Sequence, residues 1–244
     1  MRSAIRRTVN RLLRPAGVRL VSARWGPRGF GATLCKLKRA GFRPVQVVDV
    51  GASNGTWTRE CMTIFPEAAY FLVDPLSENA DALRRLAAER DNVTFWCGAL
   101  GASEGTGNLN VHADQSSFLR SGEFSSGLNR TVPVRTLDSF VADGTILPAS
   151  LLKADVQGFE LEVLEGADRT MNTVEALLLE LSFRRIYEEC RLADEVISYL
   201  ACRGFRIFDF CSYVQREADE ALLQSDVVFV RREHPVFSKE GWIG

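Results

Sequence analysis

The chain has 244 residues, of which 46% are hydrophobic and 25% are charged, a composition typical of a globular domain with a full core. No apolar run approaches the roughly 18 residues that a membrane-spanning helix needs. Residues 1–48 hold 12 of the 30 basic residues and no acid, which leaves 18 basic residues against 31 acidic ones elsewhere. A site for nucleic acid needs a basic face, so we predict no nucleic-acid partner.

The six cysteines form no C-x-x-C pair and have no zinc-ligand spacing. They are therefore predicted to be reduced, which favours a cytoplasmic protein. The chain has few candidate metal ligands, because the only histidines are His112 and His234.

The first 20 residues place apolar side chains on one helical face among arginines, and Pro15 ends the pattern. Three interpretations stay open. The helix packs on the domain, which we favour; it contacts an anionic membrane surface through residues 1–25, at the inner face of a membrane; or it is an organelle presequence. In each case we treat residues 1–28 as a basic helical extension of one domain over residues 29–244.

From residue 29 onward, helices and strands alternate. We predict helices over residues 29–41 (closed by Gly41), 56–64, 77–90 (capped by Ser77), 158–171 and 191–204. Seven strands are predicted over residues 45–50, 69–75, 92–101, 151–156, 175–183, 204–210 and 225–232. Repeated β-α units predict a doubly wound, mostly parallel α/β sheet, with residues 204–232 as an antiparallel edge pair. Such sheets bind ligands beyond the carboxyl ends of their strands.

The segment VQVVDVGASNGTW (residues 45–57) fits three kinds of loop. As a hydrolase elbow, G-x-S-x-G would make Ser53 the nucleophile, but it follows the first strand and no HGGG-like segment accompanies it. As a dinucleotide loop it lacks the G-x-G-x-x-G cradle for pyrophosphate, because Gly51 and Gly55 are separated by three other residues. As an S-adenosylmethionine loop it needs only a tight turn, which D-x-G-x-x-x-G from Asp49 supplies.

An S-adenosylmethionine site also needs an acid at the end of the second strand to accept hydrogen bonds from the ribose hydroxyls. Asp74 lies 23 residues after Gly51, near the spacing of about 20 for such an acid in related folds. The alternative role for Asp74 is that of an Asp-Pro turn residue.

At these residues the sequence resembles the FkbM-type methyltransferases. The similarity runs from about residue 40 to 185 through six segments in order: VVDVGASNG, NVTFWCGALGASEG, QSSFL, VPVRTLDSF, LLKADVQGFELEVLEGA and LLLELS. Ser53, Ala154 and Gln157 depart from the family pattern; Gln157 replaces a usual Glu, which weakens any argument for a metal.

The resemblance implies a class I, Rossmann-like fold and methyl transfer from S-adenosyl-L-methionine to a hydroxyl of a sugar, glycan or secondary metabolite. The glycine loop, the acid after the second strand and the turn after the third strand are expected to bind the cofactor, through Asp49, Gly51, Ser53, Asn54, Gly55, Asp74, Pro75, Gly98, Ala99, Leu100 and Asp155. A rival hypothesis is a non-catalytic module of the same fold that serves as a binding or scaffold protein.

An alcohol is a poor nucleophile, so a base that takes its proton would add roughly 10²- to 10⁴-fold. Asp155, after the fourth strand, is the first candidate; its alternatives are a helix cap or a carboxylate that orients the ligand's amino group. Glu180, in an otherwise apolar strand, is the second candidate, and Glu160 the third. Together these acids could also hold a divalent cation, although we predict no metal.

His112, Ser116 and Ser117 are candidates for acceptor contacts, and residues 113–130 for a lid.

Overall fold

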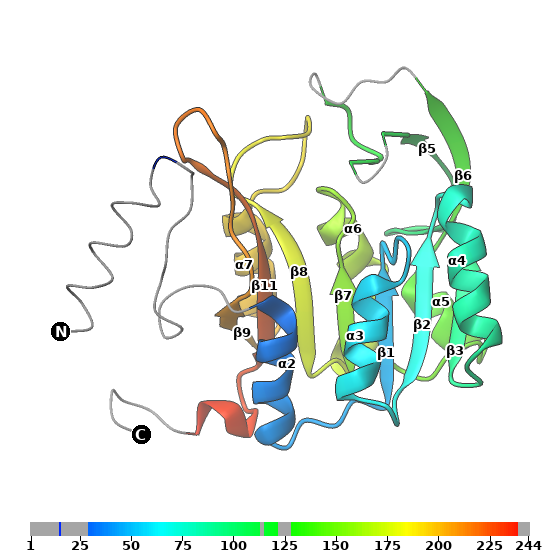
Figure 1. The fold of residues 1–244 in the computed structure, drawn as a ribbon, viewed down its shortest axis with the longest axis vertical. Helices are drawn as coiled ribbons and strands as arrows, with labels where there is room; N and C mark the ends of the chain where they lie inside the picture. Colours follow the sequence, from blue (N-terminus) through cyan, green and yellow to red (C-terminus); the bar gives the residue numbers. More distant parts are fainter. Residues whose placement is uncertain (1–14, 16–28, 113–114, 122–127, 239–244) are drawn as a thin grey trace.

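The computed structural model describes residue 15 and residues 29–112, 115–121 and 128–238 (Figure 1). The predicted basic helix, the extension over residues 1–28 and its membrane contact thus lie outside the described residues, Pro15 apart.

The main sheet has eight strands, in the order β10-β11-β8-β7-β1-β2-β3, and β9 also pairs with β11. The strands of its parallel part are β1 (Gln46–Val50), β2 (Ala69–Asp74), β3 (Val93–Cys97), β7 (Leu151–Ala154) and β8 (Ala176–Ser182). The other three are β9 (Phe205–Phe210), β10 (Val214–Gln215) and β11 (Leu222–Arg231). β11 runs antiparallel to β8 and to β9, so the mostly parallel sheet with an antiparallel C-terminal strand is confirmed. The eighth strand is the two-residue β10.

Helices cover both faces of the sheet, because its central strands are apolar on both sides (Figure 1). Val48 and Val50 enter one core, and Val47 enters the other. The Val47 core lies under α2 (Gly29–Arg39), α3 (Thr56–Ile64) and α4 (Ser77–Ala88). The Val48 core lies under α5 (Leu137–Ala142), α6 (Glu160–Glu165) and α7 (Ala193–Cys202). Two short 3₁₀ turns, η2 (Thr170–Asn172) and η3 (Pro235–Phe237), complete the described helices.

A second, three-stranded sheet lies above the carboxyl ends of the main strands (Figure 1). It consists of β4 (Ala99–Leu100), β6 (Asn129–Arg135) and β5 (Gly105–Asn110), in that order. The prediction of one continuous strand over residues 92–101 is therefore wrong. The chain leaves the main sheet at Gly98, where a Cβ would lie 2.4 Å from the Trp96 ring, and then pairs with β6.

Two helix boundaries also differ from the prediction. Ser77 is the first residue of α4 rather than its cap, and the cap position is Leu76. The helix predicted over residues 158–171 shrinks to Glu160–Glu165. Gly158 has a φ of +92°, which keeps it out of the helix, and the helix ends at Gly166, which packs against the Gly101 carbonyl.

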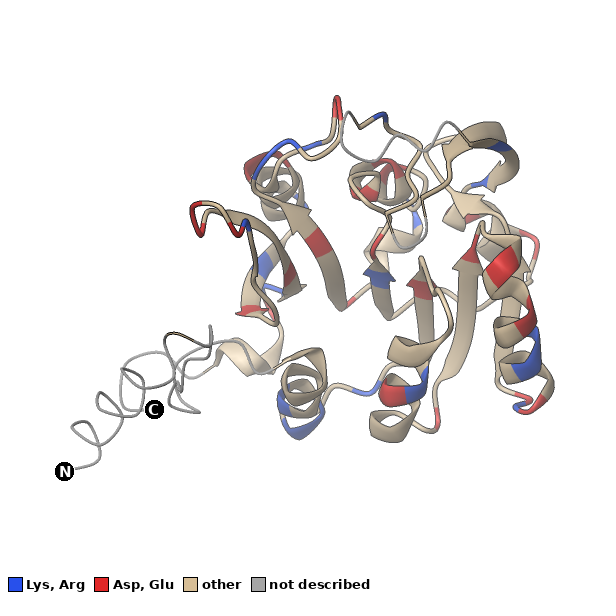
Figure 2. Cartoon of the chain, turned by 45° about the horizontal axis from the view of Figure 1, so that its top comes forward, with Lys and Arg blue, Asp and Glu red and all other residues tan. Residues whose placement is uncertain are grey.

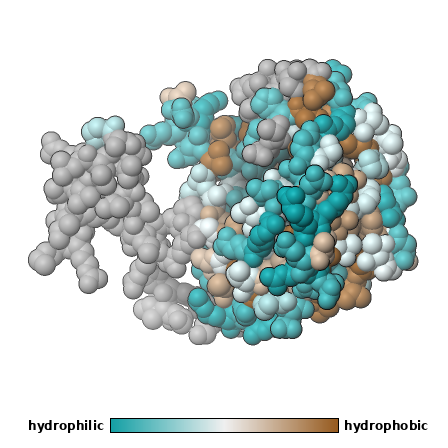
Figure 3. All heavy atoms as spheres, turned by 45° about the vertical axis from the view of Figure 1, so that its right-hand side comes forward, coloured by the Kyte–Doolittle hydropathy of each residue, from teal (hydrophilic) through white to brown (hydrophobic). Residues whose placement is uncertain are grey.

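The outer surface is largely hydrophilic on the face that Figure 3 shows, with hydrophobic residues in scattered spots. Among the described residues, we find no helix with the length and apolar character to cross a bilayer. All six cysteines fall within the described residues and are free.

Candidate active site

A cavity of about 300 Å³ opens at the carboxyl ends of β1, β2 and β7, beneath the second sheet. This is the lower end of the range for small-molecule sites. Its wall contains most of the predicted cofactor residues, which are Gly51, Ser53, Asn54, Asp74, Pro75, Gly98, Ala99, Leu100 and Asp155. Val50, Val73, Leu76 and Phe159 add apolar surface.

The glycine loop after β1 lies directly against the loop after β7. Gly51 has a φ of +73°, and a Cβ there would lie 2.0 Å from the carbonyl oxygen of Asp155. The backbone N–H groups of Gly51 and Ala52 both donate to the Val73 carbonyl. Only glycine fits this position, because any side chain would clash with the loop after β7.

Asp74 is 4% exposed and lies at the cavity wall. Its Oδ2 accepts a hydrogen bond from the Ser53 N–H at 2.7 Å, and its Oδ1 accepts from Leu76 N–H and Asn79 Nδ2, each at 3.0 Å. Burial raises the pKa of Asp74, and these three donors oppose that effect. A carboxylate has about four acceptor positions, so one remains for a ligand hydroxyl.

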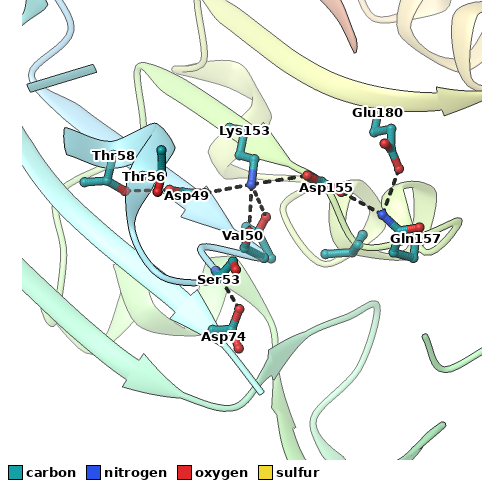
Figure 4. Close-up of polar contacts among 12 residues, drawn as sticks. Asp49, Val50, Ser53, Thr56, Thr58, Asp74, Lys153, Asp155, Gln157 and Glu180 are labelled. Atoms are coloured by element: carbon teal, nitrogen blue, oxygen red, sulfur yellow. Dashed lines mark hydrogen bonds and ion pairs between the residues drawn. The ribbon is translucent and has the colours of Figure 1, made fainter. Parts of the chain in front are cut away.

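Lys153 lies beneath the glycine loop and was not predicted as a site residue (Figure 4). Its Nζ is 3.0 Å from Oδ1 of Asp49, and it donates to the Gly51 carbonyl at 2.8 Å. The other Asp49 oxygen, Oδ2, accepts from Thr58 Oγ1 at 2.5 Å. Burial works against the ammonium charge, but Asp49 and Asp155 outweigh it and raise the pKa of Lys153. Asp49 thus supports the loop from below and does not line the cavity.

Gln157 links the two leading catalytic candidates (Figure 4). Its Nε2 donates to Oδ1 of Asp155 at 3.1 Å and to Oε2 of Glu180 at 2.9 Å, while its Oε1 accepts from the Tyr187 hydroxyl at 3.0 Å. Gln224 Nε2 also donates to Oε2 of Glu180, at 2.7 Å. One amide therefore fixes the positions of both carboxylates.

The three candidate bases occupy different environments. Asp155 lines the cavity, and its side chain is 37% exposed. Burial, with Asp155 as the next cause, raises the pKa of Glu180 to about 9. Burial raises the pKa of Glu160 to about 7, and its Oε1 accepts from the backbone N–H groups of Val156 and Gly158. Glu160 therefore turns back onto its own loop, and neither glutamate is part of the cavity wall.

The predicted acceptor residues separate into two groups. Ser116 and Ser117 line the cavity, and the Ser117 hydroxyl donates to the Gln157 carbonyl at 2.8 Å. His112 is exposed and lies outside the cavity wall, as does the buried Gly55. Of the proposed lid, residues 113–114 and 122–127 lie outside the described residues. Within the described ranges, no group of three or more His, Cys, Asp or Glu side chains is arranged to hold a metal ion.

The doubly wound sheet, its antiparallel C-terminal strand and the cavity at the glycine loop define a class I, Rossmann-like methyltransferase fold. The family model for the methyltransferase FkbM domain matches residues 49–207. The chain belongs to the FkbM methyltransferase family.

Two curated relatives are similar over part of their length. Hexuronic acid methyltransferase AglP of Haloferax volcanii is 25% identical over 159 residues, which are 61% of this chain and 63% of the relative. The 2-O-methyltransferase NoeI of Sinorhizobium fredii is 22% identical over 160 residues, which are 58% of this chain and 65% of the relative. The match thus spans just under two thirds of each relative.

Among solved structures, the methyltransferase FkbM of Methylobacillus flagellatus KT is similar with a TM-score of 0.49 and 16% identity. The alignment covers 76% of this chain and 43% of that one.

Proposed function

We propose that the protein transfers a methyl group from S-adenosylmethionine to a hydroxyl oxygen of a sugar, a glycan or a secondary metabolite. The main observation in support of this proposal is that Gly51, Asp74 and Asp155 line the same cavity. The names of the two curated relatives, a hexuronic acid methyltransferase and a 2-O-methyltransferase, support a sugar hydroxyl as the acceptor.

The residues at the cavity fit this cofactor. Asp74 has an acceptor position left for a ribose hydroxyl, and Gly51 lines the cavity, where the amino-acid end of the ligand can lie against the glycine loop. Val73, Leu76 and Leu100 offer an apolar wall for the adenine. When bound, S-adenosylmethionine supplies an activated methyl group on a sulfonium whose charge disappears as the methyl leaves.

Asp155 is the base in this proposal, because it is the one candidate carboxylate at the cavity wall. Its Oδ1 is held by Gln157, and its Oδ2 lies 3.8 Å from Lys153 Nζ. The carboxylate would accept the proton of the acceptor hydroxyl as the oxygen–carbon bond forms. Glu180 is a poor base at neutral pH, since burial and Asp155 raise its pKa to about 9 and keep it protonated.

Calorimetric titration with S-adenosylmethionine and S-adenosylhomocysteine, with NAD as a control ligand, tests the cofactor. We expect binding of both sulfur ligands, weakened roughly 10- to 100-fold by Asp74→Ala, in line with about 1.5–3 kcal/mol for a hydrogen bond to a charged group. Asp91→Ala, at an exposed turn, is the matched control. Failure of the folded protein to bind either sulfur ligand would refute the proposal.

Gln157 is the observation that favours the rival hypothesis of a non-catalytic module, because an amide replaces the usual carboxylate beside the candidate base. Turnover separates the two hypotheses. A protein that binds S-adenosylmethionine but methylates none of a broad panel of hydroxyl acceptors would support the module.

A further inference from the structure

A second cavity, also of about 300 Å³, lies on the other side of the glycine loop. It has Gly51, Ser53, Asn54 and Asp155 in common with the cofactor cavity, so these four residues form a wall between the two spaces. Its remaining lining residues come from the glycine loop, α2, the start of α3 and the sheet, and they are Phe30, Ala52, Thr56, Trp57, Lys153, Leu178 and Asp226.

The pairing of the strands explains why polar groups gather in this cavity. Lys153 is in register with Asp49 on one side and with Leu178 on the other, and Asp226 is in register with Glu180. Side chains alternate between the two faces of a strand, so residues in register point to the same face. Figure 2 shows the resulting acidic positions on the central strands, with a basic position among them.

We propose that this second cavity binds the methyl acceptor, and that it selects an uncharged polyhydroxylated ring over a uronate. The inference rests on the proposed function and specifies its substrate. The position of Asp155 in the walls of both cavities supports this proposal, because a base between them can reach a hydroxyl on one side and the reacting centre on the other.

The lining has the chemistry of a sugar site. Phe30 and Trp57 lie with ring centroids 5.8 Å apart and give an apolar surface for the C–H face of a ring. The carboxylates of Asp155 and Asp226 and the hydroxyl of Thr56 offer hydrogen bonds to ring hydroxyls.

The charge in the cavity argues against an anionic acceptor. Lys153 is the only basic residue in the described lining, and its ammonium is paired with Asp49 at 3.0 Å. Asp155 and Asp226 then leave the cavity negative. Like charges brought together at a binding site cost several kcal/mol, so a sugar carboxylate should be rejected.

The test uses matched pairs of methyl pyranosides that differ only at C6, with CH2OH in one member and carboxylate in the other. Binding to the full chain is measured by saturation-transfer NMR, and methyl transfer with labelled S-adenosylmethionine. We expect at least one neutral glycoside to bind and to be methylated, and its uronate to bind at least roughly tenfold more weakly. A uronate that binds as well as its neutral partner, or no pyranoside that binds, would overturn the proposal.

Two variants locate the site. Asp226→Asn should reduce the discrimination against uronates, with Asp219→Asn in an exposed turn as its control. Thr56→Phe, at an exposed position of the lining, should abolish glycoside binding, whereas Thr63→Phe further along α3 should not. Glycoside binding that survives Thr56→Phe would place the acceptor elsewhere.

The test of the second cavity can be distinguished from the test of the proposed function. Binding of S-adenosylhomocysteine by calorimetry reports on the cofactor cavity, whereas saturation transfer to a glycoside reports on the second cavity without turnover. A protein that binds a glycoside but not S-adenosylhomocysteine would refute the proposed enzyme and would still support the sugar site.

Discussion

The carbonyl oxygen of Asp155 occupies the space where a side chain at Gly51 would begin, at 2.0 Å from the position of its Cβ. The loops that follow β1 and β7 are therefore in direct backbone contact, and the Asp155 N–H donates to the Val50 carbonyl at 3.1 Å. The glycine loop and the candidate base are positioned as one unit.

Gly51→Ala should consequently abolish cofactor binding. Gly144→Ala is a matched control, because its φ of +77° imposes nearly the same backbone penalty as the +73° of Gly51, with no heavy atom within 4 Å of the new Cβ. That penalty is about 1–2 kcal/mol. We expect both variants to lose this much stability in urea unfolding, and Gly51→Ala to lose more and to stop binding S-adenosylhomocysteine in calorimetry. Equal behaviour of the two variants would show that the contact with Asp155 is unimportant.

Lys153→Met should destabilise the protein by about 3–5 kcal/mol, because it leaves the Asp49 carboxylate buried without its partner. The double variant Lys153→Met/Asp49→Asn removes both charges and should recover most of that loss. The free energy of unfolding in urea is measured for the wild-type protein, the single variant and the double variant. A double variant no more stable than the single one would mean that Lys153 acts mainly through the Val50 and Gly51 carbonyls.

Asp155→Asn should lower the turnover number by roughly 10²- to 10⁴-fold if Asp155 takes the acceptor proton. The amide keeps the shape of the side chain, so the affinity for S-adenosylhomocysteine should change little. Asp168→Asn, on the exposed surface, is the control. If the variant instead loses cofactor affinity at unchanged turnover, Asp155 orients the ligand and the base is another group.

The stability of the protein should fall as the pH rises from about 5 to 9. Burial and the neighbouring Asp155, Glu160 and Asp226 raise the pKa of Glu180 to about 9, and Lys153 only partly offsets them. The folded state therefore holds a proton that the unfolded chain releases near pH 4.3. The stabilisation is complete below that pH and is lost as the pH rises through the folded pKa.

Glu180→Gln should reduce this slope, because the amide stays uncharged and its oxygen can still accept from Gln157 and Gln224. Urea unfolding at intervals of one pH unit measures the slope, with the exposed Glu89→Gln as control. The same slope in the wild-type protein and in Glu180→Gln would assign the proton to a different group.

The parts of the site that follow strand ends were predictable from the sequence. Gly51 and Asp74 were identified by their spacing within a β-α-β pattern, and both line the cavity. The doubly wound arrangement follows from the same pattern, and the strand order reverses between β3 and β7, so that β1 lies next to β7.

Lys153 was missed although its signal is present in the sequence. A charged residue inside the buried strand LLKADV needs a partner, but its partner Asp49 lies more than 100 residues earlier and becomes adjacent only when β1 pairs with β7. Glu180 was recognised as needing a partner; its donor Gln224 is placed by the pairing of β11 with β8, and its donor Gln157 comes from the loop after β7.

The second sheet could not be predicted because its strands carry little hydrophobic pattern. β5 reads GTGNLN and is mostly exposed, and β6 reads NRTVPVR with one fully buried position, Val132. Such strands form because they pair with each other and with the residues after Gly98. This is tertiary context, which overrides weak local preferences.

The glycine loop is held in place by the protein's own hydrogen bonds. The N–H groups of Gly51 and Ala52 bond to Val73, that of Ser53 bonds to Asp74, and that of Gly55 bonds to Ala52. Lys153 holds the Gly51 carbonyl from beneath. A ligand that enters the cavity therefore meets a loop whose conformational entropy was already lost on folding, and almost none of its binding free energy goes into ordering that segment. The amides of this loop should accordingly exchange slowly with solvent even in the free protein.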